Sequence, residues 1–325
     1  MTRLPDDAQD LLFPEDRPPD PMLRGGEIAS LAADLPAGVR LGTSSWTFPG
    51  WTSILWSERA GRSETTLARE GLPEYVASPL LRTVGLDRGF YRPITTSQAE
   101  SLAKQAGAGF RFLVKAYRGL THLSTPDVRF LDGSYATDVV IAPLLEGLGE
   151  TFGTLLFQFP EMRVRDRDAT RFLARLDAFL GELPAGPPYA VEIRDRALLS
   201  RSLATVLRDH GVAFGHALHP ALPSMDEQRE ALGWDGDDLA GPAVLRWLLR
   251  AGLSYEGAKT KYEPFDRLLE PDAPSRRSVA EWCLARAAAA REVIVIANNK
   301  AEGSAPLTLL ELAREIAAVR AHRSL

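Results

Sequence analysis

The chain has 325 residues, of which 45% are hydrophobic and 25% charged, the composition of a globular protein with a sizeable core. Its formal net charge of -5 excludes a global positive field that would attract nucleic acid regardless of sequence. Because Cys283 is the single cysteine, the chain can form neither an internal disulfide nor a cysteine-rich metal site.

The N-terminal segment, residues 1–37, is rich in proline, aspartate and glutamate and poor in apolar side chains. Such a segment buries too little surface to offset the entropy lost on ordering, so it is predicted to be a mobile acidic tail. It lacks the basic start and apolar run of a secretory signal, and no later stretch approaches the roughly 20 apolar residues that span a bilayer. We therefore expect a cytoplasmic protein without a membrane partner.

A short apolar island, "QDLLF", lies within this tail. It resembles the peptide by which bacterial proteins dock on the DNA sliding clamp, in which a glutamine precedes a Leu-Phe pair. Here the matching residues are Gln9, Leu12 and Phe13. The alternative is a locally packed tail. The island thus indicates a sliding clamp as one candidate partner.

From residue 38 onward, short apolar and β-branched runs alternate with longer segments of helical period. The segment 96–108, which opens on a Thr/Ser cap with a carboxylate in its first turn, and the segment 167–183 are typical amphipathic helices. Eight such strand and helix units predict a (β/α)8 TIM-type barrel, a single domain over residues 38–325. The predicted strands are 39–45, 81–86, 110–116, 153–159, 189–194, 212–218, 243–249 and 292–299.

The alternative architecture is a doubly wound open sheet. It is disfavoured because no G-x-G-x-x-G sequence follows the first predicted strand. The segment 219–242, between the sixth and seventh predicted strands, is rich in proline, glycine and acidic residues. We expect it to contain little regular helix.

In TIM barrels the active site lies at the carboxyl ends of the strands, so the residues that close each run are the site candidates. Nearly every predicted strand ends in a polar residue after an apolar body, which predicts a polar pocket. The candidates from the eight strands are Ser44, Ser45, Trp46, Asp87, Lys115, Gln158, Glu192, Arg194, His216, His219, Arg246, Asn298, Asn299 and Lys300.

Several of these runs resemble a known family. "GTSSWTFPGW", "FYRP", "GFRFLVKA", "LLFQFP", "YAVEIRD" and "IANNKAEGSAPLTLLEL" are similar, in this order over about residues 38–318, to the YecE-like family, also called domain of unknown function 72. The resemblance implies a TIM-type barrel and no settled biochemical activity. The run "FYRP" adds Tyr91 and Arg92 to the candidate ligand-binding residues.

The chain departs from the family pattern in its second predicted strand. Gly85 stands where the family has an acidic residue, and Asp87 stands where it has asparagine. A mechanism that relied on a carboxylate at position 85 would require Asp87 to replace it.

Lys115 and Glu192 are the candidate catalytic pair, because a lysine and a carboxylate that face one pocket could exchange protons with a substrate. They could equally position a ligand or form a structural ion pair. Arg194 lies on the same side of its strand as Glu192 by the period-two rule. A guanidinium so close would lower the pKa of Glu192 and make it a poorer general acid.

His216 and His219, together with Glu192, have the ligand types of a two-histidine, one-carboxylate metal site. The H-x-x-H spacing alone is weak evidence, and ordinary pocket histidines are the favoured interpretation. We therefore predict no cofactor and keep a divalent metal as an alternative.

The loop after the eighth predicted strand has the composition of an anion site. Asn298, Asn299 and Lys300 precede a helix, and barrels often hold phosphate in this region. The alternative is that both asparagines cap loop backbone and the lysine is solvated.

Two functions remain open at this point. The first is an enzyme, a hydrolase or isomerase, that uses Lys115 and Glu192 on a small molecule bearing a phosphate or carboxylate. The second is a non-catalytic module that binds nucleic acid or another phosphodiester and is recruited to DNA replication or repair through the N-terminal tail.

Overall fold

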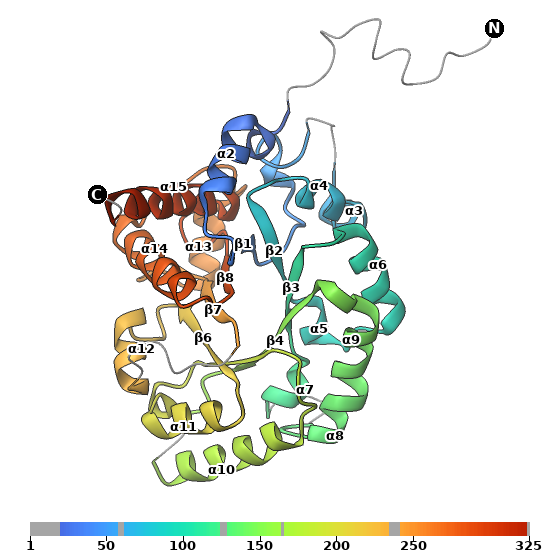
Figure 1. Cartoon of the computed structure of the whole chain (residues 1–325), viewed down its shortest axis with the longest axis vertical. Helices are drawn as coiled ribbons and strands as arrows, with labels where there is room; N and C mark the ends of the chain where they lie inside the picture. Colours follow the sequence, from blue (N-terminus) through green and yellow to red (C-terminus); the bar gives the residue numbers. More distant parts are fainter. Residues whose placement is uncertain (1–19, 58–61, 124–128, 164–165, 234–240, 324–325) are drawn as a thin grey trace, which may run out of the picture.

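The computed structural model describes residues 20–57, 62–123, 129–163, 166–233 and 241–323. Eight parallel strands form a closed barrel in which each strand pairs with its neighbours in sequence order and β8 pairs with β1 (Figure 1). The predicted (β/α)8 barrel is confirmed. The strands are β1 (Val39–Thr43), β2 (Leu81–Leu86), β3 (Arg111–Lys115), β4 (Phe152–Phe159), β5 (Tyr189–Ile193), β6 (Ala213–Leu218), β7 (Ala243–Trp247) and β8 (Val293–Ala297).

Helices surround the barrel, and Figure 1 shows α10, α11, α12, α14 and α15 around one side of it and α3, α4, α6 and α9 around the other. The helices are α2 (Gly26–Asp34), α3 (Glu64–Glu70), α4 (Leu72–Val76), α5 (Arg88–Tyr91), α6 (Thr96–Ala106), α7 (Arg118–Thr121), α8 (Gly133–Tyr135), α9 (Ala142–Leu148), α10 (Asp166–Glu182), α11 (Arg201–Asp209), α12 (Met225–Leu232), α13 (Tyr255–Tyr262), α14 (Ala273–Ala288) and α15 (Ala305–Arg323). The π-helix η4 (Ala136–Ile141) leads into α9, and the short 3-10 helices are η2 (Met22–Arg24), η3 (Pro49–Trp51), η5 (Gly149–Thr151) and η6 (Arg196–Leu198).

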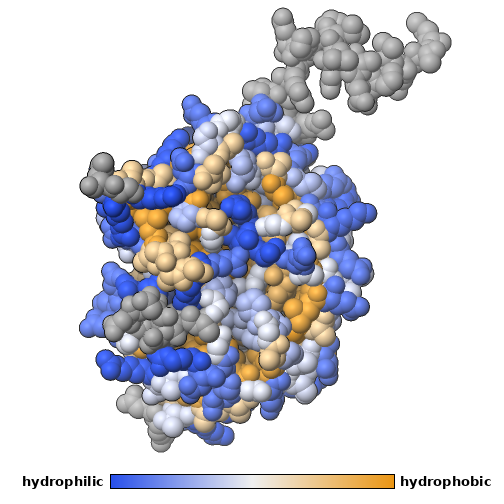
Figure 2. Space-filling view, viewed as in Figure 1, coloured by the Kyte–Doolittle hydropathy of each residue, from blue (hydrophilic) through white to orange (hydrophobic). Residues whose placement is uncertain are grey.

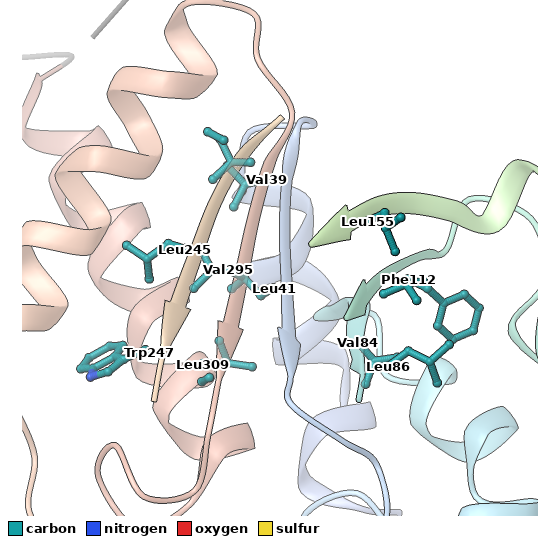
Figure 3. Close-up of a cluster of buried hydrophobic side chains, with 14 of the residues drawn as sticks. Val39, Leu41, Val84, Leu86, Phe112, Leu155, Leu245, Trp247, Val295 and Leu309 are labelled. Carbon is teal, nitrogen blue, oxygen red and sulfur yellow. The ribbon is translucent and has the colours of Figure 1, made fainter. Parts of the chain in front are cut away.

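The largest hydrophobic cluster lies between the outer face of the strands and the helices. Figure 3 shows part of it, with Val39 and Leu41 of β1, Val84 of β2 and Val295 of β8 among the labelled side chains. A second, smaller cluster fills the barrel interior and consists of Leu113, Leu156, Ala190, Ala213, Val244, Ile294 and Ile296. On the face shown in Figure 2, hydrophilic side chains cover much of the rim, and apolar side chains show between them in separate patches.

The small residue Gly42 allows β1 and β2 to approach closely. A Cβ atom at this position would lie 2.0 Å from the carbonyl oxygen of Thr83. The register of β1 against β2 shifts between Leu41 and Gly42, at this same contact. The "LGT" run at the start of the barrel is therefore explained by strand packing.

The helix α12 corrects one prediction. The segment 219–242 was expected to hold little regular helix, but residues Met225–Leu232 form a helix that buries Met225, Gln228 and Leu232. A capping box between Ser224 and Glu227 starts it, and Gly233 ends it in a left-handed conformation. The sequence contained these boundary signals, but the surrounding proline, glycine and acidic residues obscured them. Residues 234–240 lie outside the described part of the chain.

The helix α6 begins at Thr96, so its cap lies one residue earlier than the sequence indicated. Its cap is Thr95, whose hydroxyl accepts a hydrogen bond from the Gln98 amide, and the Gln98 side chain completes the capping box. The described first turn contains no carboxylate, because Gln98 takes the role expected of an acidic residue.

The predicted boundary of the N-terminal tail at residue 37 is wrong. Leu23 is completely buried, and its amide donates to the carbonyl oxygen of Ile54. The helix α2 packs against α15, and Arg320 Nη1 donates to the carbonyl oxygen of Asp34 at 2.6 Å (Figure 1). Composition averaged over 37 residues hid the i, i+3, i+4, i+7 pattern of Ile28, Leu31, Ala32 and Leu35, all of which contact the core.

Residues 1–19, which include Gln9, Leu12 and Phe13, lie outside the described residues. The proposed sliding-clamp contact is therefore still a prediction. In the described part of the chain, we find no helix with the length and apolar character needed to cross a membrane.

We predict that Leu23→Ala lowers the free energy of unfolding by about 2–5 kcal/mol, because it leaves a cavity where a buried leucine joins residues 20–37 to the barrel. Met22→Ala is the matched control, since the Met22 side chain is 51% exposed. Chemical denaturation measures both variants. Equal, small effects would show that residues 20–37 do not belong to the cooperative fold.

Candidate functional site

A buried ion-pair network occupies the barrel interior at the carboxyl ends of the strands. The carboxylate of Glu192 is completely buried and accepts hydrogen bonds on both oxygens. Arg194 Nε donates to Oε1 at 2.9 Å, and Arg246 Nη1 donates to Oε2 at 2.9 Å. With Asp87 and Lys115, which interact with them electrostatically, these residues form what we call the ionic cluster.

The alternation of the strands places the ionic cluster on the inner face. Lys115, Glu192 and Arg246 each lie two residues after a member of the interior hydrophobic cluster, as do Gln158 and Asn298. Gln158 is buried and pairs in register with Glu192 across β4 and β5. The ionic cluster therefore lies in the layer above the apolar floor of the barrel.

The neighbouring strand β6 makes room for these long side chains. Its inward residues at this level are Gly215 and Ala217, and a Cβ atom at Gly215 would lie 3.4 Å from Cβ of Glu192. Ala217 pairs in register with Arg246. Small residues on β6 thus allow the Glu192 carboxylate and the Arg246 guanidinium to meet inside the barrel.

The charge of Glu192 is maintained by its arginine partners. Burial raises the pKa of the Glu192 carboxyl, but the charges and hydrogen bonds of Arg246 and Arg194 outweigh burial and hold the pKa below its ordinary value. Burial also disfavours the charged form of Arg246, and the carboxylate of Glu192 more than compensates, so the pKa of Arg246 is raised. Glu192 is therefore a permanent carboxylate near neutral pH and a poor general acid.

The environment of Lys115, unlike that of Glu192, disfavours the charged form of the side chain. Its Nζ lies 3.7 Å from the centroid of the Phe90 ring and forms no salt bridge with any described residue. Burial and then the charge of Arg246 lower the pKa of Lys115 from 10.5 to about 8, against the opposing carboxylates of Asp87 and Glu192. Lys115 can therefore gain and lose a proton close to neutral pH, as a general acid or base must.

Two side chains near Lys115 were missed by the sequence analysis, namely Phe90 and His122. The His122 ring lies 5.1 Å from the Phe90 ring, and its Nδ1 lies 2.8 Å from Thr121 Oγ1. Burial lowers the pKa of His122, with further contributions from Lys115 and Arg118. His122 escaped notice because it follows α7 rather than the end of a strand.

Ser44 and Asn298 meet at the junction of β1 and β8. Asn298 Nδ2 donates to Ser44 Oγ at 2.9 Å, and Asn298 Oδ1 accepts from the Lys300 amide at 3.0 Å. Ser45 Oγ lies 3.1 Å from Thr47 Oγ1 in the same loop. The structure thus brings together the predicted residues at the ends of the first and last strands.

Two other predicted site residues, Trp46 and Asn299, are buried and make hydrogen bonds that stabilise the fold. Trp46 is 3% exposed and donates its indole N–H to the carbonyl oxygen of Leu67 in α3, so it packs in the core rather than beside Lys115. Asn299 is buried, and its Oδ1 accepts from the Ala305 amide at 2.8 Å and from Trp51 Nε1 at 3.2 Å. It therefore closes the N-terminus of α15, the second of the two interpretations considered for this loop.

Three further candidates, Lys300, Tyr91 and Arg92, lie outside the ionic cluster. Lys300 is buried, with its Nζ 3.9 Å from the centroid of the Tyr255 ring. Tyr91 is 67% exposed and Arg92 is exposed at the end of α5. The structure does not bring these three residues into the ionic cluster.

His216 and His219 cannot share a metal ion as considered from the sequence. His216 packs on the helix side of β6, where its ring lies 5.0 Å from Phe214 and 5.8 Å from Trp282. Burial lowers the pKa of His216 to about 3. His219, three residues on, follows the end of β6, and the charges of Arg194, Glu192 and Arg246 act on it. Among the described residues, no three His, Cys, Asp or Glu side chains are grouped so that they could hold a metal ion.

The family model described as "Protein of unknown function DUF72" matches residues 40–324. A DUF72 family protein from Thermotoga maritima has a similar structure, with a TM-score of 0.56 and 20% identity over 85% of this chain and 98% of that one. A DUF72 family protein from Enterococcus faecalis superposes with a TM-score of 0.58 and 18% identity over 86% of this chain and 95% of that one. At these identities the likeness shows the fold. No curated protein matches the chain.

We predict that Glu192→Gln lowers the free energy of unfolding at pH 7 by about 3–5 kcal/mol, because it leaves two guanidinium groups without their buried counter-charge. Since the folded-state pKa of Glu192 is depressed, its contribution is present above pH 4.5 and is lost as the pH falls below it. Denaturation curves between pH 3 and 7 measure both effects, with exposed Glu230→Gln as control. A variant with unchanged stability and acid dependence would contradict the role of the ion pairs.

We also predict that acetylation of Lys115, followed by peptide mass spectrometry, has a half-maximal rate near pH 8. Asp87→Asn moves this midpoint to lower pH, because it removes a carboxylate that favours the protonated amine. Asp226→Asn, at an exposed position of α12, leaves the midpoint unchanged. A midpoint at the ordinary lysine value, or one insensitive to Asp87, would refute this description of Lys115.

Proposed function

The chain belongs to the DUF72 family, and we propose that its barrel binds a small anionic molecule, bearing a phosphate or a carboxylate, at the ionic cluster. The observation that supports this proposal is the way in which Glu192 engages its two arginines. It accepts one N–H group from each guanidinium, through Nε of Arg194 and Nη1 of Arg246. The described residues take up no other N–H group of either side chain, so a ligand can accept from them.

The charges of the ionic cluster favour an anion. Three cationic side chains, Lys115, Arg194 and Arg246, stand against two carboxylates, Asp87 and Glu192. Their Coulomb interactions are strengthened by burial, because the effective dielectric constant inside a barrel is far below that of water. A bound monoanion would compensate the surplus positive charge.

Within this site we assign proton transfer to Lys115 and positioning to Glu192. A lysine whose pKa is about 8 exists in both protonation states near neutral pH. Glu192 has both oxygens engaged and is held as a carboxylate, so it orients the guanidinium groups. This division replaces the sequence-based hypothesis of a Lys115 and Glu192 acid–base pair.

The reaction class that fits these roles is proton transfer on an anion-bearing substrate, as in a hydrolase or an isomerase. Arg194 and Arg246 would hold the anionic group, and Lys115 would accept a proton from the substrate or from water and later return it. A module that only binds a phosphodiester would use the same donors without needing the proton of Lys115 to move.

We predict that inorganic phosphate binds to the protein in isothermal titration calorimetry at pH 7, and that Arg194→Gln weakens binding on the order of tenfold or more, because hydrogen bonds to charged groups are lost. Arg196→Gln is the matched control, since Arg196 is exposed and donates to the carbonyl oxygen of Ala221. Binding should also weaken as the pH rises through about 8, where Lys115 loses its charge.

Lys115→Arg separates the enzyme from the binding module. Arginine keeps the positive charge but does not release a proton, so an enzyme would bind the anion and lose turnover. Absence of phosphate binding by the folded wild-type protein, or an equal effect of Arg194→Gln and Arg196→Gln, would reject the anion site.

A further inference from the structure

We propose that the anionic ligand also has an apolar body, and that this body occupies a cavity of about 460 Å³ that is lined in part by His219, a residue on which the charges of the ionic cluster act. The inference rests on the proposed function, because it concerns the rest of the ligand whose anionic group is proposed to bind at the ionic cluster. The cavity lies between the β6–α12 loop, the end of β7 and the first turns of α14. Its apolar walls are Leu218, Leu222, Met225, Trp247, Leu249 and Val279.

His219 connects this cavity to the ionic cluster. Ala217 pairs with Arg246 across β6 and β7 and lies on the inner face of the barrel. His219 follows two residues later, just beyond the end of β6, where it lines the cavity and is acted on by the charges of Arg194, Glu192 and Arg246. A ligand whose anionic group contacts Arg246 or Arg194 can therefore extend past His219 into the cavity.

The hydrogen bonding of His219 suits such a junction. Its Nδ1 accepts from the Ala221 amide at 3.1 Å, so in the neutral ring the proton is on Nε2, which is left as a donor. Burial, followed by the charge of Arg194, lowers the pKa of His219 against the opposing effect of Glu192. The neutral ring offers one hydrogen bond and an apolar surface to the ligand.

The carboxylates around the cavity already have partners. Asp272 Oδ2 lies 3.2 Å from Arg250 Nη1, and Asp272 Oδ1 accepts from the Ser275 amide. Asp226 forms an ion pair with Arg229 at 3.1 Å. Because these charges are compensated, the cavity does not repel an anionic ligand, and its apolar walls favour a hydrophobic group. The volume is that of sites for small organic molecules.

A second cavity, of about 540 Å³, suits this body less well. It lies beside Phe48, Tyr255 and Lys300, and three carboxylates, those of Glu64, Glu256 and Glu263, contribute to its lining. Within the part of the chain that the structure describes, Glu263 forms an ion pair with Lys259 at 3.8 Å, and neither Glu64 nor Glu256 has a lysine partner. The repulsion from the other carboxylates disfavours a molecule that is itself an anion.

The test compares two probes, inorganic phosphate and phenyl phosphate, by calorimetry at pH 7. We expect phenyl phosphate to bind on the order of tenfold more tightly to the wild-type protein, because its ring is removed from water in the cavity. Leu222→Asn removes this advantage and leaves the affinity for inorganic phosphate within about twofold. Ala251→Glu places a charge at an exposed position of the cavity lining and alters no buried side chain. We expect it, too, to remove the advantage of phenyl phosphate and to leave the affinity for inorganic phosphate nearly unchanged. Ala29→Glu, on the exposed face of α2, is the control for the added charge.

The outcomes separate the two proposals. If inorganic phosphate binds but phenyl phosphate binds no better, the apolar body is refuted and the anion site stands. If phenyl phosphate binds better and both cavity variants keep that advantage, the ring lies elsewhere and the inference is also refuted. If neither probe binds to the folded protein, the proposed function fails together with the inference.

Discussion

The buried carboxylate of Glu192 is the constraint on which the interior of this barrel depends. A carboxylate without water is stable only when each oxygen has a partner, and here each oxygen has a guanidinium N–H at 2.9 Å. One partner, Arg194, directly follows the end of the same strand, and the other, Arg246, lies in β7, two strands away around the barrel. The ion pairs therefore fix the relative height of β5 and β7 as well as the charge of the site.

The same charges give Lys115 its unusual chemistry. Arg246 stabilises the Glu192 carboxylate and simultaneously destabilises a protonated Lys115, so one guanidinium acts on the two groups in opposite directions. Asp87 limits this effect, because its carboxylate favours the charged amine. Asp87 thus supplies a carboxylate that acts on Lys115, in a chain that has glycine instead of an acidic residue at position 85. Burial therefore lowers the pKa of Lys115 most, and the opposing charges of Arg246 and Asp87 adjust it further.

Strand positions could be predicted from the sequence because apolar runs and helical periods alternate along the chain, but the sequence located the site residues less completely. The pairing of Glu192 with Arg194 follows from their i, i+2 spacing, whereas Arg246 is 54 residues away and is brought to Glu192 only by closure of the barrel.

His216 was misplaced because residues were chosen by their position at the end of a strand, without asking which face of the strand they occupy. The small residues Ala213, Gly215 and Ala217 marked the inner face of β6, and His216 alternates with them. Trp46 was misplaced because its loop turns towards α3 after β1.

The two adjacent asparagines after β8 explain why the proposed anion site would depend on side-chain charge. Asn298 faces Ser44 at the mouth, whereas Asn299 turns away and accepts the Ala305 amide at the start of α15. The next helical residue, Pro306, has no N–H group to offer. The first two residues of α15 therefore offer no free N–H group to phosphate, because the Ala305 amide is bonded to Asn299 and Pro306 has none. An anion bound at the proposed site would therefore depend on Lys115 and the two arginines. Because the pKa of Lys115 is lowered to about 8, the affinity for that anion would vary with pH in a way that binding to backbone amides would not.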